Sequence, residues 1–545
     1  MGIDPVEPAL SPTVGPKPAA RPAVEIDPTA APDPDPGVPA GPYSEPAGAA
    51  EAVGAAVAET HAPHPPSTDV PGGSRELLKL ALPLIVSQSF MTVQVFVDTV
   101  LLSWHDPREM AASFPAVMWY WLFFGLLQVT AGYTSTFVAQ YTGAKRPHRV
   151  GAAVWQGIHF AVVAGVLFLV VVPAAPHLIA VGGHTPEIQR LETIYLRCLA
   201  FAALPMLVMG AINGFFSGRG QTWTVLGIEA AGTAVNIVLA LVLIFGEQGV
   251  TKVVHLTPDG EPIKLHLPGI PGTPEMGIEG AGWATVAGSW AAALFALALM
   301  LRKKYRDEFG TFSGWKPERE LFRRLMVYGG PAGMQVFLDV LVFNAFTQLV
   351  GRLGDAALGA TTLAIRLNMI AFLPMMGMGQ AICIMVGQRL GGDRPDLAEK
   401  STYTGLKWTF GYMSLIALAY VTIPTVLLSV FEGDKEPEQF AAIAALVPNL
   451  LLCVAVFSVA DAINVSFAFA LRGAGDTKYV TALTFALAWP LMVIPTAVVV
   501  FNGGNLYWCW VFATLHIIGM SVCFWFRFRG GKWKSMRVIE PGLSE

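Results

Sequence analysis

Long apolar runs follow one another through this sequence from residue 76 onward. A helix needs about 20 consecutive apolar residues to cross the hydrocarbon core of a bilayer. Only 14% of the chain is charged, against about 25% in soluble domains. We therefore expect an all-α polytopic membrane protein with twelve transmembrane helices. Their predicted positions are near 77–103, 115–141, 150–175, 189–215, 223–245, 279–302, 325–350, 358–386, 398–430, 442–470, 478–501 and 505–527.

Lysine and arginine concentrate in alternate loops. If the N-terminus lies in the cytoplasm, every inside loop is basic, as the positive-inside rule requires. The segment 302–324 is the most basic of them, and another inside loop carries Arg472 and Lys478. The sequence therefore predicts a multi-pass protein of the inner (plasma) membrane with both termini in the cytoplasm.

Two segments outside the runs have a clear character. Residues 1–73 are rich in Pro, Ala and Gly and almost free of large apolar side chains. Such a segment cannot bury enough surface to offset the entropy of ordering, so we predict a disordered cytoplasmic extension. Residues 250–268 place two β-prone arms around the turn signal P-D-G-E, which predicts a small external hairpin.

The sequence argues against several classes of function. No nucleophile–base pair or metal-ligand spacing gathers at one depth, so we do not expect an enzyme, and no phosphate-binding loop suggests direct use of ATP. The five cysteines are scattered and show neither a disulfide framework nor a metal spacing. No basic patch suggests nucleic acid as a partner. We expect no cofactor other than a coupling ion.

The chain contains an internal repeat. The motif V-A-Q-Y-T-G-A-K-R-P at 138–147 matches V-G-Q-R-L-G-G-D-R-P at 386–395, and Pro83 and Pro331 are separated by the same offset. Two six-helix units that enter from the same side should be related by a pseudo-two-fold axis along the membrane normal. The predicted organisation is a disordered extension (1–73), a first six-helix bundle (74–303), a cytoplasmic linker (304–324), a second six-helix bundle (325–530) and a cytoplasmic tail (531–545).

The first apolar run carries one deep carboxylate, Asp98. A charged side chain facing lipid would cost about 2.5 kcal/mol or more, so Asp98 should face the protein interior or a water-filled cavity. Ser87, Gln94 and Asp98 are spaced to lie on one helical face. Two interpretations remain, a buried structural carboxylate or a site that binds a cation or proton. At the repeat offset Asp98 corresponds to Phe346, so the two bundles do not share this site.

Five motifs, in order along the chain, resemble the multidrug and toxic compound extrusion (MATE) transporters of bacterial type. The resemblance covers about residues 75 to 530. It implies two six-helix bundles and a secondary antiporter. Such a protein uses alternating access to export organic compounds, expected to be cationic and amphipathic, in exchange for H+ or Na+. The motifs are P-L-I-V-S-Q through F-V-D-T-V in the first run, V-A-Q-Y-T-G-A-K-R-P after the second, G-A-G-W-A-T-V at 280–286, G-Q-A-I-C-I-M-V-G-Q-R-L-G-G-D at 379–393 and D-A-I-N-V-S-F-A-F-A-L-R-G-A-G-D-T at 461–477.

The resemblance also implies roles for single residues. Asp98 matches the coupling aspartate of the family, and Asn236 and Thr285 match residues that join it in a cation site. Pro83 matches a proline that bends the first helix and could act as a hinge, with an inert kink as the alternative. The sequence departs from many relatives at Ala240, where an acidic or amide residue is common. The missing oxygen ligand weakens the case for Na+.

Four further polar residues are candidates for a substrate site or a second cation site. They are Gln335 and Asp339 in the seventh run, Asp461 in the tenth and Glu229 in the fifth. The resemblance implies cation or substrate binding for the two aspartates. Glu229 either lines the cleft or extends to the membrane surface. Arg366 in the eighth run needs a partner if it is buried, and Asp461 or Asp339 is the expected one.

The sequence leaves alternative functions open. An organic-anion exporter or a lipid-precursor flippase is one, because Arg366 could bind an anion. A non-transporting receptor or channel is another class, which would have to explain the repeat differently. The expected partners are a small-molecule substrate and membrane lipid, and the chain is expected to be a monomer.

Overall fold

The computed structural model describes residues 71–254, 263–267, 269–429 and 437–540. All of them belong to one unit of the chain, residues 68–545. The predicted disordered extension, 1–73, lies almost entirely outside the described residues.

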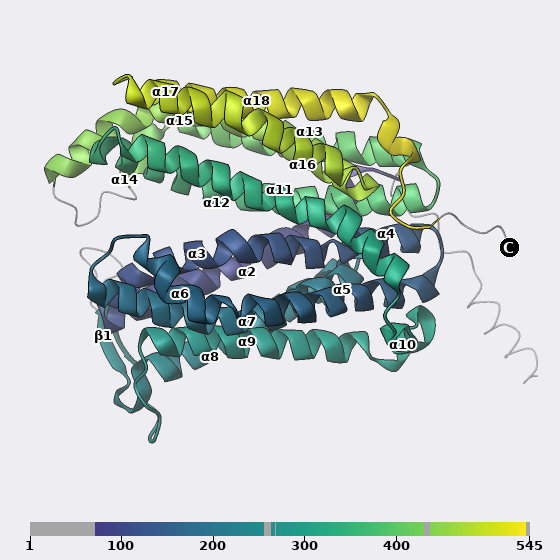
Figure 1. Ribbon diagram of the computed structural model, residues 1–545, viewed down its shortest axis with the longest axis horizontal. Helices are drawn as coiled ribbons and strands as arrows, with labels where there is room; N and C mark the ends of the chain where they lie inside the picture. Colours follow the sequence, from purple (N-terminus) through teal and green to yellow (C-terminus); the bar gives the residue numbers. More distant parts are fainter. Residues whose placement is uncertain (1–70, 255–262, 268, 430–436, 541–545) are drawn as a thin grey trace, which may run out of the picture. The chain divides into compact units, whose positions relative to one another are not determined.

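Nearly all of the described chain is helical (Figure 1). The first group of helices is coloured purple to teal, and the second green to yellow. The first group consists of α2 (Ser74–His105), α3 (Pro107–Gly132), α4 (Thr134–Gly143), α5 (Pro147–Phe168), α6 (Val171–Ala180), α7 (Pro186–Gly218), α8 (Thr222–Phe245) and α9 (Ile278–Met300). The linker contains α10 (Lys303–Phe309), and the second group consists of α11 (Arg319–Gly351), α12 (Asp355–Gly391), α13 (Pro395–Thr422), α14 (Pro424–Ser429), α15 (Pro437–Ala474), α16 (Thr477–Ala488), α17 (Ile494–Phe501) and α18 (Leu506–Arg529).

The predicted all-α fold with two six-helix bundles is confirmed. Eleven helical segments of the described chain are long and apolar enough to cross a membrane. The remaining predicted run, 398–430, corresponds to α13, a helix of 28 residues. It is long enough to cross a membrane but is less apolar than the other eleven, and charged residues such as Glu399, Lys400 and Lys407 lower its hydropathy.

Proline residues explain where several helices begin. Pro107, Pro147, Pro186 and Pro395 each stand in the first turn of α3, α5, α7 and α13. A proline is tolerated there because its missing N–H would have had no partner within the helix. Inside the eleventh predicted run, Pro490 has a different effect. It lies in a short π-helical turn that joins α16 to α17, since proline cannot donate the regular helical hydrogen bond.

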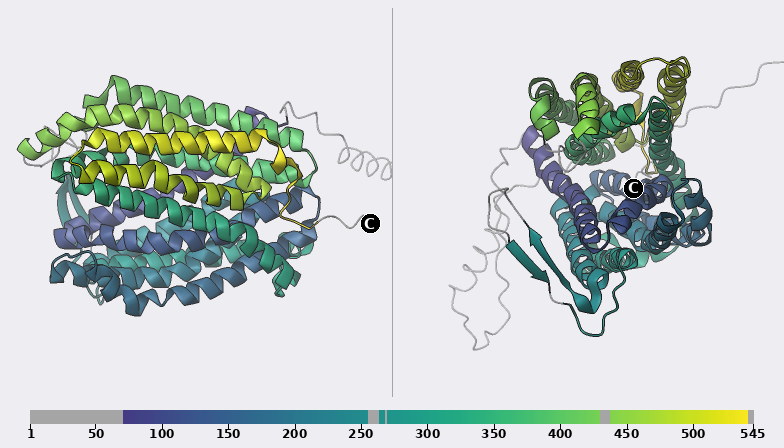
Figure 2. Two further views of the ribbon diagram at one scale, coloured as in Figure 1. Left: turned by 45° about the horizontal axis from the view of Figure 1, so that its top comes forward. Right: turned by 90° about the vertical axis from the view of Figure 1, so that its left-hand side faces the viewer.

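Equivalent helices of the two bundles make equivalent contacts. In the first bundle α2 packs against α8, and α7 packs against α5 and α9. In the second bundle α11 packs against α16, and α15 packs against α13 and α18. The end-on view in Figure 2 shows the two groups of helices side by side. The repeat in the sequence is therefore a repeat of packing.

The same repeat is visible in the backbone between helices. Lys145 and Asp393 are the non-glycine residues with a positive φ in the described chain, at 55° and 52°. They occupy the same position in the matching motifs, directly before Arg-Pro. A left-handed conformation is unfavourable for residues other than glycine, so its occurrence at both positions shows that the two loops fold alike.

The two bundles meet along helices near the pseudo-two-fold axis. Helix α3 packs against α11, and α12 packs against both α2 and α4. We call the end where α2 begins, α10 lies and α18 ends the linker side, and the opposite end the hairpin side. At the linker side a Cβ atom on Gly143 would lie 1.9 Å from the carbonyl oxygen of Gln388, and one on Gly391 would lie 2.0 Å from that of Gln140. Only glycine permits this approach.

The predicted hairpin is present between α8 and α9; that it lies outside the cell stays a prediction. Strands β1 (Val250–Val254) and β2 (Ile263–Leu267) pair antiparallel, with Val250 opposite Leu267 and Val254 opposite Ile263. The predicted P-D-G-E turn, 258–261, lies outside the described residues.

The C-terminal segment, Lys532–Glu540, is packed onto the linker side. It belongs to the predicted cytoplasmic tail, 531–545, for which the sequence had indicated no packing. Trp533 is fully buried and stacks on Phe528, with ring centroids 4.5 Å apart. Val538 is also fully buried, and its backbone N–H donates to Gln140 Oε1 at 2.8 Å. The segment therefore contributes to the core that closes this end of the protein.

Candidate functional site

Asp98 lies on the inward face of α2, as its position in the apolar run predicted. Its side chain is only 5% exposed, and its Oδ1 atom has no hydrogen-bond partner among the described residues. Ser87 of the same predicted stripe is buried as well. A buried carboxylate oxygen without a donor is costly, so its environment favours binding of a proton or a cation.

Asn236 and Thr285 form a buried pair between α8 and α9. Asn236 Nδ2 donates to Thr285 Oγ1 at 3.2 Å, and the Thr285 hydroxyl donates in turn to the carbonyl of Ala281 at 3.1 Å. Asn236 Oδ1 is buried and has no partner within the described chain. Two unpartnered oxygens, one from Asp98 and one from Asn236, therefore lie in the first bundle.

Asp98, Asn236 and Thr285 lie at the same depth. They are seven, nine and seven residues from the hairpin-side ends of their helices, which is about 10 to 14 Å at 1.5 Å per residue. Helix α2 also contacts both α8 and α9. No hydrogen bond in the described chain joins Asp98 to Asn236 or Thr285, but Tyr195 of α7 is within electrostatic range of Asp98.

Ala240 is the position at which the sequence predicted a missing oxygen ligand. Ala240 is fully buried, one turn beyond Asn236 on α8, and offers no oxygen. The donor set of this region is one carboxylate, one amide and one hydroxyl. A proton needs only the carboxylate, whereas a hard cation prefers several oxygens.

The predicted hinge, Pro83, lies inside α2 and is buried. The helix packs closely against α12 two residues after Pro83, at Ile85. A Cβ atom on Gly377 would lie 2.6 Å from a side-chain atom of Ile85 and 2.8 Å from its backbone. A change in the bend at Pro83 would therefore displace α12, a helix of the second bundle.

The second bundle holds its acids in two different environments. Asp461 is 6% exposed, and its Oδ1 accepts a hydrogen bond from Asn464 Nδ2 at 3.0 Å. Nearby on α15, the Ser458 hydroxyl donates to Asn368 Oδ1 of α12 at 2.7 Å. Asp339 on α11 has an exposed side chain, so it lines open space rather than the packed core.

The expected ion pair between Arg366 and an acid of the second bundle is not formed. Arg366 is exposed, makes no ion pair with a described residue, and lies 5.9 Å from the ring centroid of Phe114 in the first bundle. The arginine near these acids is Arg472, which donates to Gln335 Oε1 from two nitrogens at 2.8 and 3.3 Å and lies within electrostatic range of Asp339.

Arg472 was missed because the tenth helix was predicted to end too early. The predicted run stops at residue 470, which assigns Arg472 to a basic loop, whereas α15 continues to Ala474. The helix carries the guanidinium over the ring of Phe469, at 4.9 Å from its centroid. Arg472 directly precedes the segment 473–480, which matches the segment 218–225 in the first repeat. Since α7 continues to Gly218, this match was the signal that could have placed Arg472 within a helix.

Glu229 is held within the first bundle. It lies seven residues into α8, and its Oε1 accepts a hydrogen bond from Asn213 Nδ2 of α7 at 2.7 Å. The side chain is half-buried and engages a neighbouring helix.

Comparison with known families decides what this arrangement belongs to. The MatE family model matches residues 83–242 and again residues 331–499. Together, the two matches cover more than half of the chain. The chain belongs to the MatE family. The two matches begin at Pro83 and Pro331, so the family unit occurs twice at the offset of the internal repeat.

Other MatE proteins resemble this chain along most of its length. It is 26% identical to the multidrug resistance protein NorM of Aliivibrio fischeri over 461 residues, which covers 84% of this chain and 91% of that protein. It is 25% identical to the multidrug resistance protein PmpM of Pseudomonas aeruginosa over 418 residues, covering 76% and 81%.

Solved structures share its fold. One, described as an outward-facing conformation of a multidrug resistance MATE family transporter, superposes with a TM-score of 0.72 at 18% identity and covers 85% of this chain and 97% of its own. A transporter from Pyrococcus furiosus superposes with a TM-score of 0.72 at 19% identity and the same coverage. The protein is thus an integral membrane protein with the MatE fold.

Proposed function

We propose that this MatE protein is a secondary active antiporter. It exports organic compounds, cationic and amphipathic in character, in exchange for H+ or Na+. The observation that carries the proposal is Asp98, a buried carboxylate whose Oδ1 lacks a hydrogen-bond partner in the described chain. The names of the relatives, multidrug resistance proteins, support multidrug efflux.

The proposed coupling mechanism rests on the free-energy cost of the buried Asp98 carboxylate when no proton or cation is bound to it. An uncompensated carboxylate at this depth costs about 2.5 kcal/mol or more, and binding of a proton or cation removes most of that cost. A ligand shifts a conformational equilibrium only by its differential affinity for the two states. Loading of Asp98 therefore favours the conformation of α2 in which the carboxyl is best sheltered, and Pro83 is the point at which α2 can change.

Alternating access requires that this change open one side and close the other. The close contact of Gly143 and Gly391 with opposite backbones supports a linker side that is shut in the described state. The basic loops lie on that side, so we place both termini in the cytoplasm. Substrate would then leave from the hairpin side as the coupling ion enters.

Proteoliposomes test the proposal directly. Efflux of a fluorescent organic cation is measured under an imposed pH gradient and, separately, an imposed Na+ gradient. Asp98→Asn should abolish gradient-driven efflux in a folded protein, while Asp307→Asn, which removes an exposed acid of the linker helix, should transport normally. Full transport by Asp98→Asn would contradict the proposal, and the gradient that drives the wild type identifies the ion.

A second candidate is export of organic anions or flipping of a lipid precursor. The observation in its favour is Arg366, an exposed arginine that faces Phe114 across the two bundles and lacks an acidic partner in the described chain. In that case anionic compounds should displace a bound fluorescent ligand, and Arg366→Ala should remove the effect. Ion flux without any countertransport would instead indicate a channel.

A further inference from the structure

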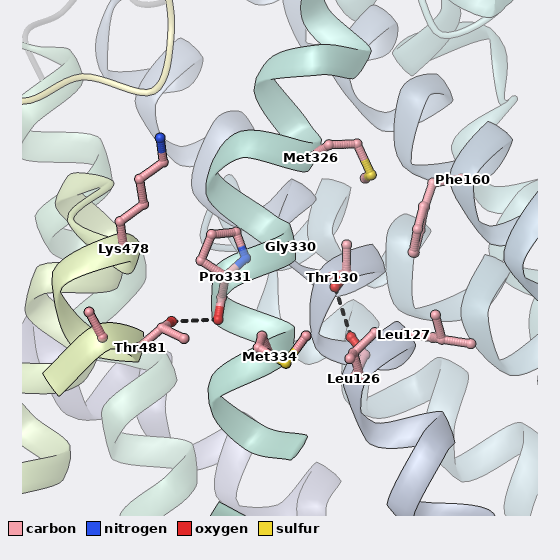
Figure 3. Close-up of a pocket in the computed structure, with 11 residues that line it drawn as sticks. Leu126, Leu127, Thr130, Phe160, Met326, Gly330, Pro331, Met334, Lys478 and Thr481 are labelled. Atoms are coloured by element: carbon pink, nitrogen blue, oxygen red, sulfur yellow. Dashed lines mark hydrogen bonds between the residues drawn. The ribbon is translucent and has the colours of Figure 1, made fainter. Parts of the chain in front are cut away.

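A groove of about 580 Å³ lies on the seam between the bundles (Figure 3). Helices α3 and α5 of the first bundle and α11 and α16 of the second provide its walls. None of the candidate coupling or substrate residues lines it. Its size is in the range of ligand sites in proteins, about 300 to 1,000 Å³.

The interior of the groove is apolar. Leu126, Phe160, Met326 and Met334 are among the residues that line it. The two hydroxyls that line it are already engaged as donors, Thr130 to the carbonyl of Leu126 at 2.8 Å and Thr481 to that of Pro331 at 2.6 Å (Figure 3). Because these hydroxyl protons are used within the protein, the groove suits hydrocarbon and not a polar molecule.

One charged side chain stands at the edge of this groove. Lys478 is the second residue of α16, at the linker side, and its side chain is exposed. It forms no ion pair with any residue in the described ranges. Met334 lies eight residues beyond Met326 along α11, about 12 Å deeper at 1.5 Å per residue. The groove therefore joins a cationic entrance at the end of the bundle to an apolar interior.

We propose that the groove binds an anionic phospholipid of the leaflet on the linker side. The phosphate group lies against the Lys478 ammonium, and an acyl chain occupies the apolar groove between the bundles. In the predicted orientation this is the cytoplasmic leaflet, where anionic lipids are attracted by basic residues. The proposal does not depend on the direction or the coupling ion of transport.

A glycine that lines the groove allows the groove to be filled by a single substitution. Gly330 of α11 lines the groove, and a Cβ atom added there would meet nothing within 4 Å. Leucine favours helix more than glycine does. Gly330→Leu should therefore fold normally and occupy the space of the acyl chain. Gly411 on α13 is equally open and lies away from the groove, so Gly411→Leu is the matched control.

Native mass spectrometry of the full-length protein in detergent tests the proposal. The protein is titrated with dioleoyl phosphatidylglycerol or with dioleoyl phosphatidylcholine, which has the same chains and no net charge. We expect the first phosphatidylglycerol to bind about five-fold more tightly, the factor that corresponds to about 1 kcal/mol for one basic residue near the membrane surface.

The variants separate the headgroup from the chain. Lys478→Gln should reduce the preference for phosphatidylglycerol to about one, whereas Lys407→Gln, an exposed lysine of α13, should keep it. Gly330→Leu should weaken binding of the first molecule of both lipids, and Gly411→Leu should not. Equal binding of the two lipids to the wild type, a preference that survives Lys478→Gln, or displacement of the lipid by a water-soluble aromatic sulfonate at lower concentration would overturn the proposal.

Discussion

Gln140 and Gln388 occupy equivalent positions in the two repeats, and each donates its side-chain amide to a glycine carbonyl of the opposite bundle. Gln140 Nε2 lies 3.0 Å from the carbonyl oxygen of Gly473, and Gln388 Nε2 lies 2.8 Å from that of Gly218. The two acceptors are equivalent as well, because Gly218 begins G-R-G-Q-T-W-T-V at 218–225 and Gly473 begins the matching G-A-G-D-T-K-Y-V at 473–480. These reciprocal hydrogen bonds tie the bundles together at the linker side, so opening of this side must break both.

The two hydrogen bonds differ in how deeply they are buried. Gln140 is fully buried, and its Oε1 also accepts the N–H of Val538, whereas Gln388 is half-buried. Gln140→Ala leaves two buried backbone groups without partners and Gln388→Ala leaves one, at a cost of about 1 to 3 kcal/mol for each. We expect the linker side to open more often in Gln140→Ala than in Gln388→Ala.

A native cysteine reports this opening. Cys383 is buried and contacts Thr136 across the seam, with Sγ 3.6 Å from Oγ1. Its rate of alkylation, followed by peptide mass spectrometry, should rise from wild type to Gln388→Ala to Gln140→Ala. Equal rates in all three proteins would show that these bonds do not hold the linker side closed.

A side chain at Gly143 or Gly391 should prevent the two bundles from closing together at the linker side. Gly143→Ala or Gly391→Ala would place a methyl group about 2 Å from a backbone oxygen of the other bundle, and overpacking of this kind costs about 1 to 3 kcal/mol. Both variants should lower the midpoint of thermal unfolding. Gly132→Ala, at a glycine with open space around its Cβ position, should not lower it. An unchanged midpoint in both seam variants would be inconsistent with the packing.

The packed C-terminal segment should loosen in acid. Burial raises the pKa of Glu540, but the hydrogen bond from Tyr141, at 2.6 Å, its own backbone N–H and the charge of Arg149 bring the pKa below its ordinary value of about 4.5. Since the pKa is lowered in the folded state, the stabilisation is fully present above about 4.5 and is lost as the pH falls through the lowered pKa.

Hydrogen exchange of the segment that ends at Glu540 measures this effect. The protection factor, which is the intrinsic exchange rate at each pH divided by the measured rate, should fall below about pH 4.5 in the wild type. Glu540→Gln should exchange faster at neutral pH and lose the acid-dependent step. A step of the same size in Glu540→Gln would assign it to another group.

Loss of the Thr285 hydroxyl should weaken binding of the coupling ion and change the fold little. Thr285→Val keeps the shape of the side chain but removes the acceptor for Asn236 Nδ2, which frees the amide beside the site. We expect the ion concentration for half-maximal efflux to rise about ten-fold, which corresponds to about 1.4 kcal/mol. Thr496→Val removes a buried hydroxyl without a partner in the described chain and should leave this concentration unchanged.

Apolar runs, turn signals and matching motifs in the sequence were sufficient to predict the helices, the hairpin and the repeat. Runs of apolar residues, loop lysines and the P-D-G-E signal each act locally, so the sequence alone reveals them. The inward position of Asp98 also followed from local cost, because a carboxylate in that run had to avoid lipid.

Partners across the bundles could not be predicted in the same way. Arg366 was expected to pair with an acid, yet it faces Phe114, and Arg472 approaches Gln335 instead. Which side chains meet depends on how far α15 continues and how the bundles cross, and these are tertiary properties. The burial of Val538 is of the same kind, since a short segment after the last helix carries no periodic signal.

Reverse coupling tests the role of Asp98 most directly. Proteoliposomes are loaded with an organic cation and diluted into substrate-free buffer, with a fluorescent reporter of internal pH in one arm and of internal Na+ in the other. Substrate efflux through the wild type should drive H+ or Na+ inward against an initially equal concentration, and Asp98→Asn should show no such ion movement while Asp307→Asn retains it. Substrate efflux without ion movement in the wild type, or undiminished ion movement in Asp98→Asn, would contradict coupling at Asp98.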